Sequence, residues 1–343
     1  MKKKSVYIFI CLIVLVVLFG WMIFGPATTF KQKSKYIYIY EGKDVKQQVT
    51  QQLNDKNLIH NKPMFNLLAA QLDIWKNLKS GRFEIKREQS VLDIIRILRN
   101  NTQSPVKLVI NKLRTNEDFA KMIGKNFSTD STTAMHFFMN ADSLKSFGVD
   151  SNTLLTLVIP GTYFFSWNTS LKKILEKFNI TKDNFWKENN RLQKAEALKL
   201  TPTQVYTLAS IVEEETNKNS EKDTIASVYL NRLNKNIPLQ ADPTIKFALK
   251  NFALTRIYFV DLAVSSPYNT YKNKGLPPGP ICTPSPITID AVLNEPKTDY
   301  LFFVAKSDFS GHHHFSTNYA EHQQYAKQYQ QALDEWMAAH PKQ

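Results

Sequence analysis

Three adjacent glutamates, Glu213, Glu214 and Glu215, are the residues of this sequence best placed for acid–base chemistry. They close a segment that begins at Thr201 with a threonine cap, a proline in the first turn and a glutamine three residues after the cap. This pattern is typical of the start of a helix. The sequence therefore predicts that the glutamates lie at the C-terminal end of a helix.

The apolar pattern of this helix separates the three glutamates. At about 100° per residue, one face is apolar. That face consists of Val205, Leu208, Ala209, Ile211 and Val212. Glu215 lies roughly 50° from its middle, whereas Glu213 and Glu214 lie more than roughly 100° away, toward solvent. We therefore expect Glu215 to be the partly buried carboxyl.

Partial burial suits Glu215 to act as a general acid. Desolvation disfavours an ionised carboxylate and raises its pKa. The acid then holds a proton at neutral pH and can donate it to a leaving-group oxygen. The alternative is a surface helix with an acidic end, in which Glu215 pairs with Lys218 or Lys222. Spacing alone favours that alternative, because glutamate side chains are rarely buried.

Polar loops rich in proline and glycine follow a second amphipathic helix, which is predicted over residues 224–233. Their amides, hydroxyls and tyrosines are groups that hold sugar rings, and such loops mark function more often than packing. The loop segments are residues 239–244, 267–271 and 275–281.

In this order, the segments resemble the YceG-like (MltG) endolytic murein transglycosylases. Residues 208–216, Leu-Ala-Ser-Ile-Val-Glu-Glu-Glu-Thr, resemble the catalytic helix of that family, in which the glutamate before the threonine is catalytic. The resemblance thus implies that Glu215 is the catalytic residue. The sequence departs from the family at Gly161, where the family often has an acidic residue, and at 283–285, Thr-Pro-Ser, in place of Asn-Pro-Gly. Further family blocks lie at 78–83, 220–223, 226–233, 240–244, 268–271, 275–281 and 315–318.

The resemblance implies a lytic transglycosylase, a lyase that cleaves the MurNAc-GlcNAc β-1,4 bond of nascent peptidoglycan strands. The product carries a 1,6-anhydro-MurNAc end, and the cut terminates glycan elongation. Glu215 would protonate the glycosidic oxygen, and its conjugate base would then help the C6 hydroxyl attack the anomeric carbon. We expect no cofactor and no metal. The candidate substrate contacts are Gln240, Asp242, Tyr268, Asn269 and Asn318.

Two other functions stay open. Ordinary glycoside hydrolysis uses two carboxylates, and a water-using muramidase would need Asp242 as the second. We interpret Asp242 as a turn residue, because it precedes Pro243. The other alternative is a non-catalytic peptidoglycan-binding or division scaffold, in which Glu215 merely packs.

The run His312-His313-His314 raises the question of a metal site. A hairpin over 300–305 and 312–316 would place His312 and His314 on one face and His313 on the other. No cysteine or acidic cluster lies nearby at ligand spacing, which disfavours a metal. We expect His322 to be structural or part of a cleft wall.

The elements that position this chemistry begin with a membrane anchor. Lys2, Lys3 and Lys4 precede an apolar run over 6–24, which is long enough to cross a bilayer as one helix. The lysines place the tail, residues 1–5, in the cytoplasm and the remaining chain outside the cytoplasmic (inner) membrane. A cleaved signal peptide is the alternative. It should have a shorter apolar core and a small-x-small cleavage site, whereas here the apolar residues continue to Phe24 and Gly25-Pro26-Ala27 is a poor cleavage signal.

Beyond the anchor, the patterns predict an α+β fold. A strand at 36–40, a second near 78–85 and three helices indicate a small α+β module over 36–103. Residues 78–83 resemble the membrane-proximal LysM-like module of the family, so the resemblance implies that this module is LysM-like. The helices are expected at 45–53, 64–72 and 91–98, the last capped by Ser90. Residues 104–200 would connect this module to a catalytic domain over 201–343. Cys11 lies within the apolar membrane run and Cys282 lies in the external part of the chain, so the two cannot pair.

The formal net charge of +14 constrains the partners. The chain has no nucleic-acid-binding motif, and an extracytoplasmic location removes nucleic acid as a partner. A basic surface suits an anionic membrane or wall polymer, although a merely solvated surface explains the charge equally well. We expect peptidoglycan strands and the cytoplasmic membrane as partners, and the resemblance adds the peptidoglycan polymerases.

Overall fold

The computed structural model describes residues 2–340, with the side chains of residues 4–340. Helices and small sheets alternate along the chain, so the fold is α+β, as predicted. The strands pair as β1–β2, β3–β4 and β5–β6. They are β1 (Ser34–Ile39), β2 (Gly81–Lys86), β3 (Val106–Ile110), β4 (Gly161–Phe165), β5 (Phe302–Ala305) and β6 (His313–Ser316). The α-helices are α1 (Lys2–Phe24), α2 (Val45–Asp55), α3 (Lys62–Gln71), α4 (Val91–Arg99), α5 (Asn116–Asn126), α6 (Ser131–Met139), α7 (Ala141–Lys145), α8 (Leu171–Lys187), α9 (Arg191–Ala197), α10 (Pro202–Glu215), α11 (Lys222–Asn234), α12 (Asp242–Ala248), α13 (Pro286–Leu293) and α14 (Tyr319–Ala339).

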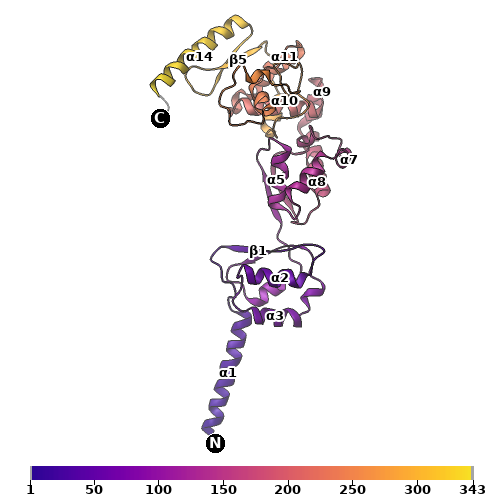
Figure 1. Cartoon of the computed structure of the whole chain (residues 1–343), viewed down its shortest axis with the longest axis vertical. Coiled ribbons are helices and arrows are strands. Elements are labelled where there is room, and N and C mark those ends of the chain that lie inside the picture. Colours follow the sequence, from indigo (N-terminus) through magenta and orange to yellow (C-terminus); the bar gives the residue numbers. More distant parts are fainter. Residues whose placement is uncertain (1, 341–343) are drawn as a thin grey trace. The chain divides into compact units, whose positions relative to one another are not determined.

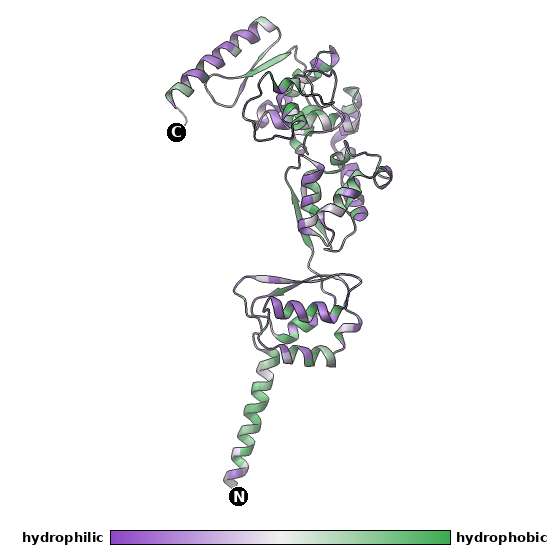
Figure 2. Ribbon diagram, in the orientation of Figure 1, coloured by the Kyte–Doolittle hydropathy of each residue, from purple (hydrophilic) through white to green (hydrophobic). Residues whose placement is uncertain are grey.

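Helix α1 is apolar along almost its whole length (Figure 2). Its span Lys4–Phe24 is long and apolar enough to cross a membrane, and its side chains are exposed. Both properties fit the anchor expected over residues 6–24. A signal sequence near the N-terminus has the same two properties.

The chain divides into two compact units, and the first contains the described residues up to Leu108 together with 126–129 and 163–170. Strands β1 and β2 pair antiparallel, with Ile37 opposite Phe83. Helices α2, α3 and α4 contribute to the same core, in which Ile37, Phe65 and Phe83 are fully buried. The cap expected at Ser90 is present as a capping box with Asp93 at the start of α4. The strands and helices expected for this region are thus confirmed.

The second unit contains residues 109–125, 130–162 and those from Leu171 onward, and α10 lies at its centre. Helices α9, α11, α12 and α13 pack against α10; α9, α10 and α11 are labelled in Figure 1. Every residue from Val205 to Val212 is buried, so the one-sided apolar face expected for this helix is wrong. Its polar residues are satisfied inside the protein, and the Tyr206 hydroxyl donates to the Val158 carbonyl at 2.6 Å.

The caps and the hairpin of this unit follow the expected pattern. Thr201 and Gln204 form a capping box at the start of α10. Strands β5 and β6 make the expected antiparallel hairpin, with Phe303 opposite Phe315. Residues 239–244 were expected to be loop throughout, but α12 begins at Asp242. The short helix α13 was not predicted, although Ser285 caps it by accepting from the amide of Thr288.

Candidate active site

A pocket with a volume of about 300 Å³ opens at the C-terminal end of α10. Its walls come from α10, α11, the segment leading into α12, strand β5 and α14. The lining residues are Glu215, Tyr229, Arg232, Leu239, Gln240, Asp242, Tyr271, Leu301, Phe302, Phe303 and His322.

The carboxyl group of Glu215 meets the pocket beside Tyr229 of α11. The Tyr229 hydroxyl donates a hydrogen bond to Oε1 of Glu215 at 2.5 Å. Desolvation raises the pKa of Glu215 to about 7; the hydrogen bond from Tyr229 opposes the rise, and the charge of Asp242 adds to it. The side chain is partly accessible. Glu215 is therefore a carboxylic acid that can hold a proton near neutral pH and reach a bound molecule.

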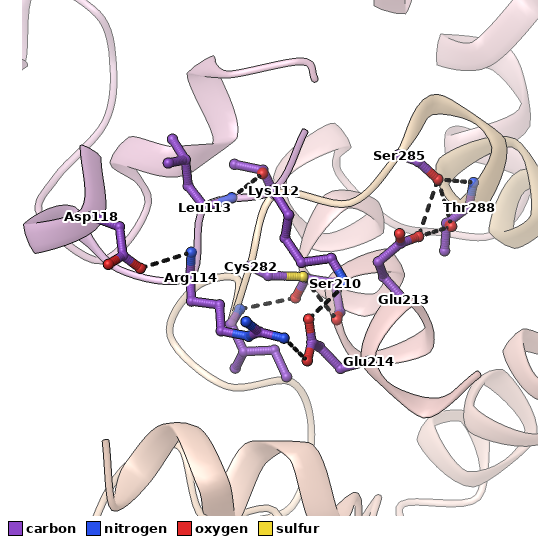
Figure 3. Close-up of polar contacts among 12 residues, drawn as sticks. Lys112, Leu113, Arg114, Asp118, Ser210, Glu213, Glu214, Cys282, Ser285 and Thr288 are labelled. Carbon is purple, nitrogen blue, oxygen red and sulfur yellow. Dashed lines mark hydrogen bonds and ion pairs between the residues drawn. The ribbon is translucent and has the colours of Figure 1, made fainter. Parts of the chain in front are cut away.

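Glu213 points away from this pocket into a polar cluster at the start of α13. It accepts from the hydroxyls of Ser285 and Thr288 (Figure 3). It also accepts from Lys222 at 3.0 Å. Burial opposes its ionisation, but the hydrogen bonds from Thr288 and Lys222 outweigh that cost and lower the pKa of Glu213. Lys222, which was considered as a partner of Glu215, is thus bonded to Glu213.

Glu214 forms ion pairs with two cations from the segment after β3. Lys112 lies 2.9 Å from one carboxylate oxygen, and Arg114 lies 3.0 Å from the other. Burial alone would raise the pKa of Glu214, but Lys112 and Arg114 lower it by more, so its pKa lies below the ordinary value. The expectation that Glu213 and Glu214 point toward solvent is wrong, because their side chains are only 13% and 17% exposed.

Arg232 and Gln240 form one wall of the pocket. The Arg232 guanidinium donates to the carbonyls of Leu301 at 2.7 Å and Leu239 at 2.9 Å, and to the Gln240 side chain at 3.0 Å. Gln240 has a φ of +56°, a left-handed conformation that is uncommon for a residue with a side chain. Such conformations persist where the surroundings enforce them, and here Arg232 holds the side chain in place.

Asp242, the second carboxylate considered, lies in the same pocket. It is the first residue of α12 rather than a turn residue. The hydroxyl of Tyr271 donates to it at 2.5 Å. Burial, and then Asp242, raise the pKa of Tyr271 well above its usual range, so this tyrosine stays a hydrogen-bond donor. Of the five expected substrate contacts, Gln240 and Asp242 are therefore beside Glu215.

Tyr268 and Asn269 lie outside this pocket. The Tyr268 ring packs against Phe247 at 4.6 Å and lines a separate cavity of about 210 Å³. Asn269 is fully buried, and its amide donates to the carbonyls of Leu262 at 3.0 Å and Val264 at 2.8 Å. Asn269 thus holds the loop that carries Tyr271 into the pocket.

Asn318 caps helix α14 by accepting from the amide of Glu321 at 2.9 Å. One turn later His322 reaches the pocket and stacks on Phe302 at 5.2 Å. His322 therefore forms part of the pocket wall, one of the two roles expected for it. Burial, and then the positive charge of Arg232, lower its pKa, which favours the neutral ring.

The three consecutive histidines do not alternate as expected. Strand β6 begins only at His313, so His312 and His313 both place Nδ1 beside Glu221, at 3.2 and 3.0 Å. His314 stacks on Tyr325 at 4.1 Å. In the part of the chain that the structure describes, no group of three or more histidine, cysteine or acidic side chains is arranged to hold a metal ion.

The sequence contains a signal for two further site residues. Tyr229 and Arg232 are three residues apart on the predicted helix 224–233, a spacing that puts both on one face. Phe302 and Phe303 carried no such signal, because β5 reaches the pocket only through tertiary packing.

Comparison with known proteins places these residues in context. The sequence profile of the YceG-like family matches residues 37–328. A protein of Bacillus subtilis (strain 168) named endolytic murein transglycosylase is 36% identical over 231 residues, which cover 67% of this chain and 60% of that protein. A protein of the same name from Streptococcus pneumoniae (strain D39) is 28% identical over 328 residues, which cover 87% of this chain and 58% of that protein. The chain thus spans about 60% of the length of these relatives.

A solved structure shares the fold. The crystal structure of a putative YceG-like protein from Listeria monocytogenes matches with a TM-score of 0.56 and 27% identity. The match covers 86% of this chain and 99% of that chain.

Proposed function

Because the chain belongs to the YceG-like family, we propose that it is an endolytic murein transglycosylase with Glu215 as its catalytic residue. The observation that carries the proposal is the Glu215 carboxyl, which combines a pKa raised to about 7 with a position in an open pocket. Its neighbours Glu213 and Glu214 are ionised and bonded to cations. Of the three glutamates, Glu215 is thus the one that can exchange a proton near neutral pH.

In the proposed reaction, Glu215 first acts as the acid. It donates its proton to the glycosidic oxygen of a MurNAc-GlcNAc bond, and that bond breaks. The resulting carboxylate accepts the hydrogen bond of Tyr229 and takes the proton of the muramyl C6 hydroxyl as that oxygen attacks the anomeric carbon. The products are a strand with a 1,6-anhydro-MurNAc end and a strand with a free GlcNAc hydroxyl. The proton returns to Glu215, and no water is consumed.

Gln240 and Asp242 are the proposed substrate contacts, since both line the pocket with polar groups. Tyr268, Asn269 and Asn318 then act indirectly. Asn269 supports the Tyr271 loop, Asn318 starts the helix that carries His322, and Tyr268 belongs to the neighbouring cavity.

Asp242 also supports a second candidate, a water-using muramidase. Two carboxylates in one pocket are the arrangement of ordinary glycosidases. The Tyr271 hydroxyl donates to the Asp242 carboxyl at 2.5 Å and so holds this second carboxyl in the pocket that contains Glu215.

Digestion of purified glycan strands separates these functions. Wild type should release fragments with 1,6-anhydro ends, Glu215→Gln should release none, and Asp242→Asn should keep the anhydro product at a reduced rate. Reducing ends in place of anhydro ends would establish the muramidase. Undiminished cleavage by Glu215→Gln would remove Glu215 from the reaction, and a wild type that binds strands without cutting them would indicate a scaffold.

The rest of the proposal concerns location and organisation. Residues 6–24 would anchor the chain in the cytoplasmic membrane with the N-terminus inside, beside the polymerases that extend nascent strands. Residues 36–103 would form a LysM-like module, 104–200 a connecting part and 201–343 the catalytic domain. Labelling of Ser34→Cys in intact cells with a membrane-impermeant thiol reagent tests the orientation, since Cys11 lies within the anchor and Cys282 is buried. An unlabelled cysteine in intact cells that becomes labelled after lysis would reverse the orientation.

A further inference from the structure

Two cations hold Glu214, the residue directly before the proposed acid. Lys112 Nζ lies 2.9 Å from Oε1 of Glu214, and Arg114 Nη2 lies 3.0 Å from Oε2 (Figure 3). Each carboxylate oxygen thus has its own cation. The Glu214 side chain is only 17% exposed, so solvent screens this cluster less than it screens a surface ion pair.

The backbone, rather than the flexible side chains alone, fixes these cations. Between them, Leu113 donates to the hydroxyl of Thr283 at 2.9 Å and accepts from the amide of Thr283 at 2.8 Å. Thr283 is fully buried. The Arg114 guanidinium also lies over the ring of Phe252 at 5.3 Å. The segment 112–114 is therefore held against the end of α10.

The charge of Glu214 acts on Glu215. Two adjacent carboxylates repel each other when both are ionised, and the charge of Glu214 contributes to the raised pKa of Glu215. Lys112 and Arg114 keep Glu214 ionised and offset its charge. Other charged or titratable groups lie around Glu215. They are Tyr229 and Arg232 on α11, Asp242 and Lys246 on α12, Tyr271, and His322 on α14.

The remaining acidic groups near α10 are bonded elsewhere. Glu213 is paired with Lys222, and Asp290 of α13 is paired with Arg191 of α9. Glu214 is thus an acidic residue beside Glu215 whose negative charge raises the pKa of Glu215. Two cations, Lys112 and Arg114, offset that charge.

We propose that Lys112 and Arg114 are positioning residues which, through Glu214, set the pH range over which Glu215 remains a proton donor. The inference rests on the proposed function for its kinetic readout. It assigns a role to charged residues that do not line the pocket.

Two substitutions that change the charge near Glu215 in opposite directions test this role. Glu214→Gln removes an anion beside Glu215, so the alkaline limb of the kcat/KM profile should move to lower pH by about half a unit. Lys112→Met removes a cation and leaves Glu214 less compensated, so the same limb should move to higher pH by a similar amount. A purely structural role would lower the rate of both variants without moving the limb in opposite directions.

Three further variants serve as controls. The double variant Lys112→Met/Glu214→Gln keeps the local charge balance and should return the limb toward its wild-type position. Lys112→Arg keeps the charge and should leave the limb in place. Glu117→Gln removes a carboxylate from a pair of similar length, 2.8 Å to Lys250, which lies outside the pocket. It should not move the limb.

A titration without substrate separates this inference from the proposed function. Carboxyl-carbon NMR of the full chain with ¹³C-labelled glutamate, using Glu215→Gln for assignment, follows the titration of Glu215 directly. Opposite shifts in Glu214→Gln and Lys112→Met support the inference even if no anhydro product forms. Shifts of the same sign, or an unchanged Glu215 titration in both folded variants, overturn it even if wild type cuts glycan.

Discussion

The Tyr229 hydroxyl donates to Glu215 at 2.5 Å, and this hydrogen bond joins helices α11 and α10 at the pocket. Tyr229 is 2% exposed, and desolvation together with Glu215 raises its pKa well above the usual range. It therefore stays a donor while Glu215 changes its protonation state. The hydrogen bond from Tyr229 stabilises ionised Glu215. In the proposed reaction, this carboxylate accepts the proton of the C6 hydroxyl.

Tyr229→Phe removes this donor and should therefore raise the pKa of Glu215 further. We expect the alkaline limb of the kcat/KM profile to move to higher pH, and kcat/KM below that limb to fall about tenfold, as for loss of a hydrogen bond to a charged group. The measurement is release of anhydro ends across pH. Tyr258→Phe, at an exposed tyrosine outside the pocket, is the matched control. A limb that stays in place would show that Tyr229 only packs.

The sequence identified Glu215 because helical periodicity is a local property. It could not place Glu213 and Glu214, because their partners depend on tertiary structure. Arg114 comes from a segment 100 residues away from Glu214. Helical periodicity also predicted one apolar face, whereas α10 lies in the core of the second unit and is buried from Val205 to Val212. Glu215 differs from its neighbours in having no cation bonded to it among the described contacts.

The residues of the pocket walls were likewise only partly predictable from the sequence. Gln240 and Asp242 were expected near Glu215, and both line the pocket. Asn269 was expected there for the same reason, a polar residue in a loop, but it faces inward to carbonyls of its own loop. Composition indicated which loops matter but not which side of the loop each side chain faces.

Glu215→Gln should stabilise the protein in a pH-dependent way. The pKa of Glu215 in the folded protein, about 7, lies above its ordinary value of 4.5. Its contribution to stability is thus complete below about pH 4.5 and is lost as pH rises through about 7. Since glutamine does not titrate, the free energy of unfolding of the variant relative to wild type should increase over that interval, on the order of 2 kcal/mol.

Denaturant unfolding of the full chain in detergent, at about pH 5 and about pH 8, measures this difference. Glu117→Gln is the opposite control, because Lys250 lowers the pKa of Glu117 more than burial raises it. That variant should not gain stability as pH rises. A Glu215→Gln difference that is equal at both pH values would contradict the raised pKa.

Asn269→Asp should disturb the pocket indirectly, because Asn269 supports the Tyr271 loop but does not line the pocket. The substitution replaces an amide donor with a carboxylate that faces the carbonyls of Leu262 and Val264. A buried acceptor beside two acceptors costs about 1 to 3 kcal/mol, and the loop that carries Tyr271 should loosen. We expect a lower unfolding free energy and a raised KM. Asn184→Asp, at an exposed asparagine of α8 outside the pocket, is the control, and equal KM values for the two variants would show that Asn269 does not support the site.

The ion pair between buried Arg191 and half-exposed Asp290 should stabilise the fold that surrounds α10 without entering the reaction. Arg191 is 5% exposed and bonds Asp290 through two nitrogens, at 2.7 and 2.9 Å. Asp290→Asn keeps the shape but leaves the guanidinium with Glu188, at 4.0 Å, as its remaining carboxylate partner among the described residues. Because solvent screens the Asp290 side, which is 37% exposed, the variant should lower the unfolding free energy by about 2 kcal/mol, whereas Glu117→Gln, at the exposed pair with Lys250, should cost less than about 1 kcal/mol. Denaturant unfolding measures both losses. Because neither Arg191 nor Asp290 lines the pocket, the rate per folded molecule should equal that of wild type, and a rate that falls with full folding would place this pair in the catalytic mechanism.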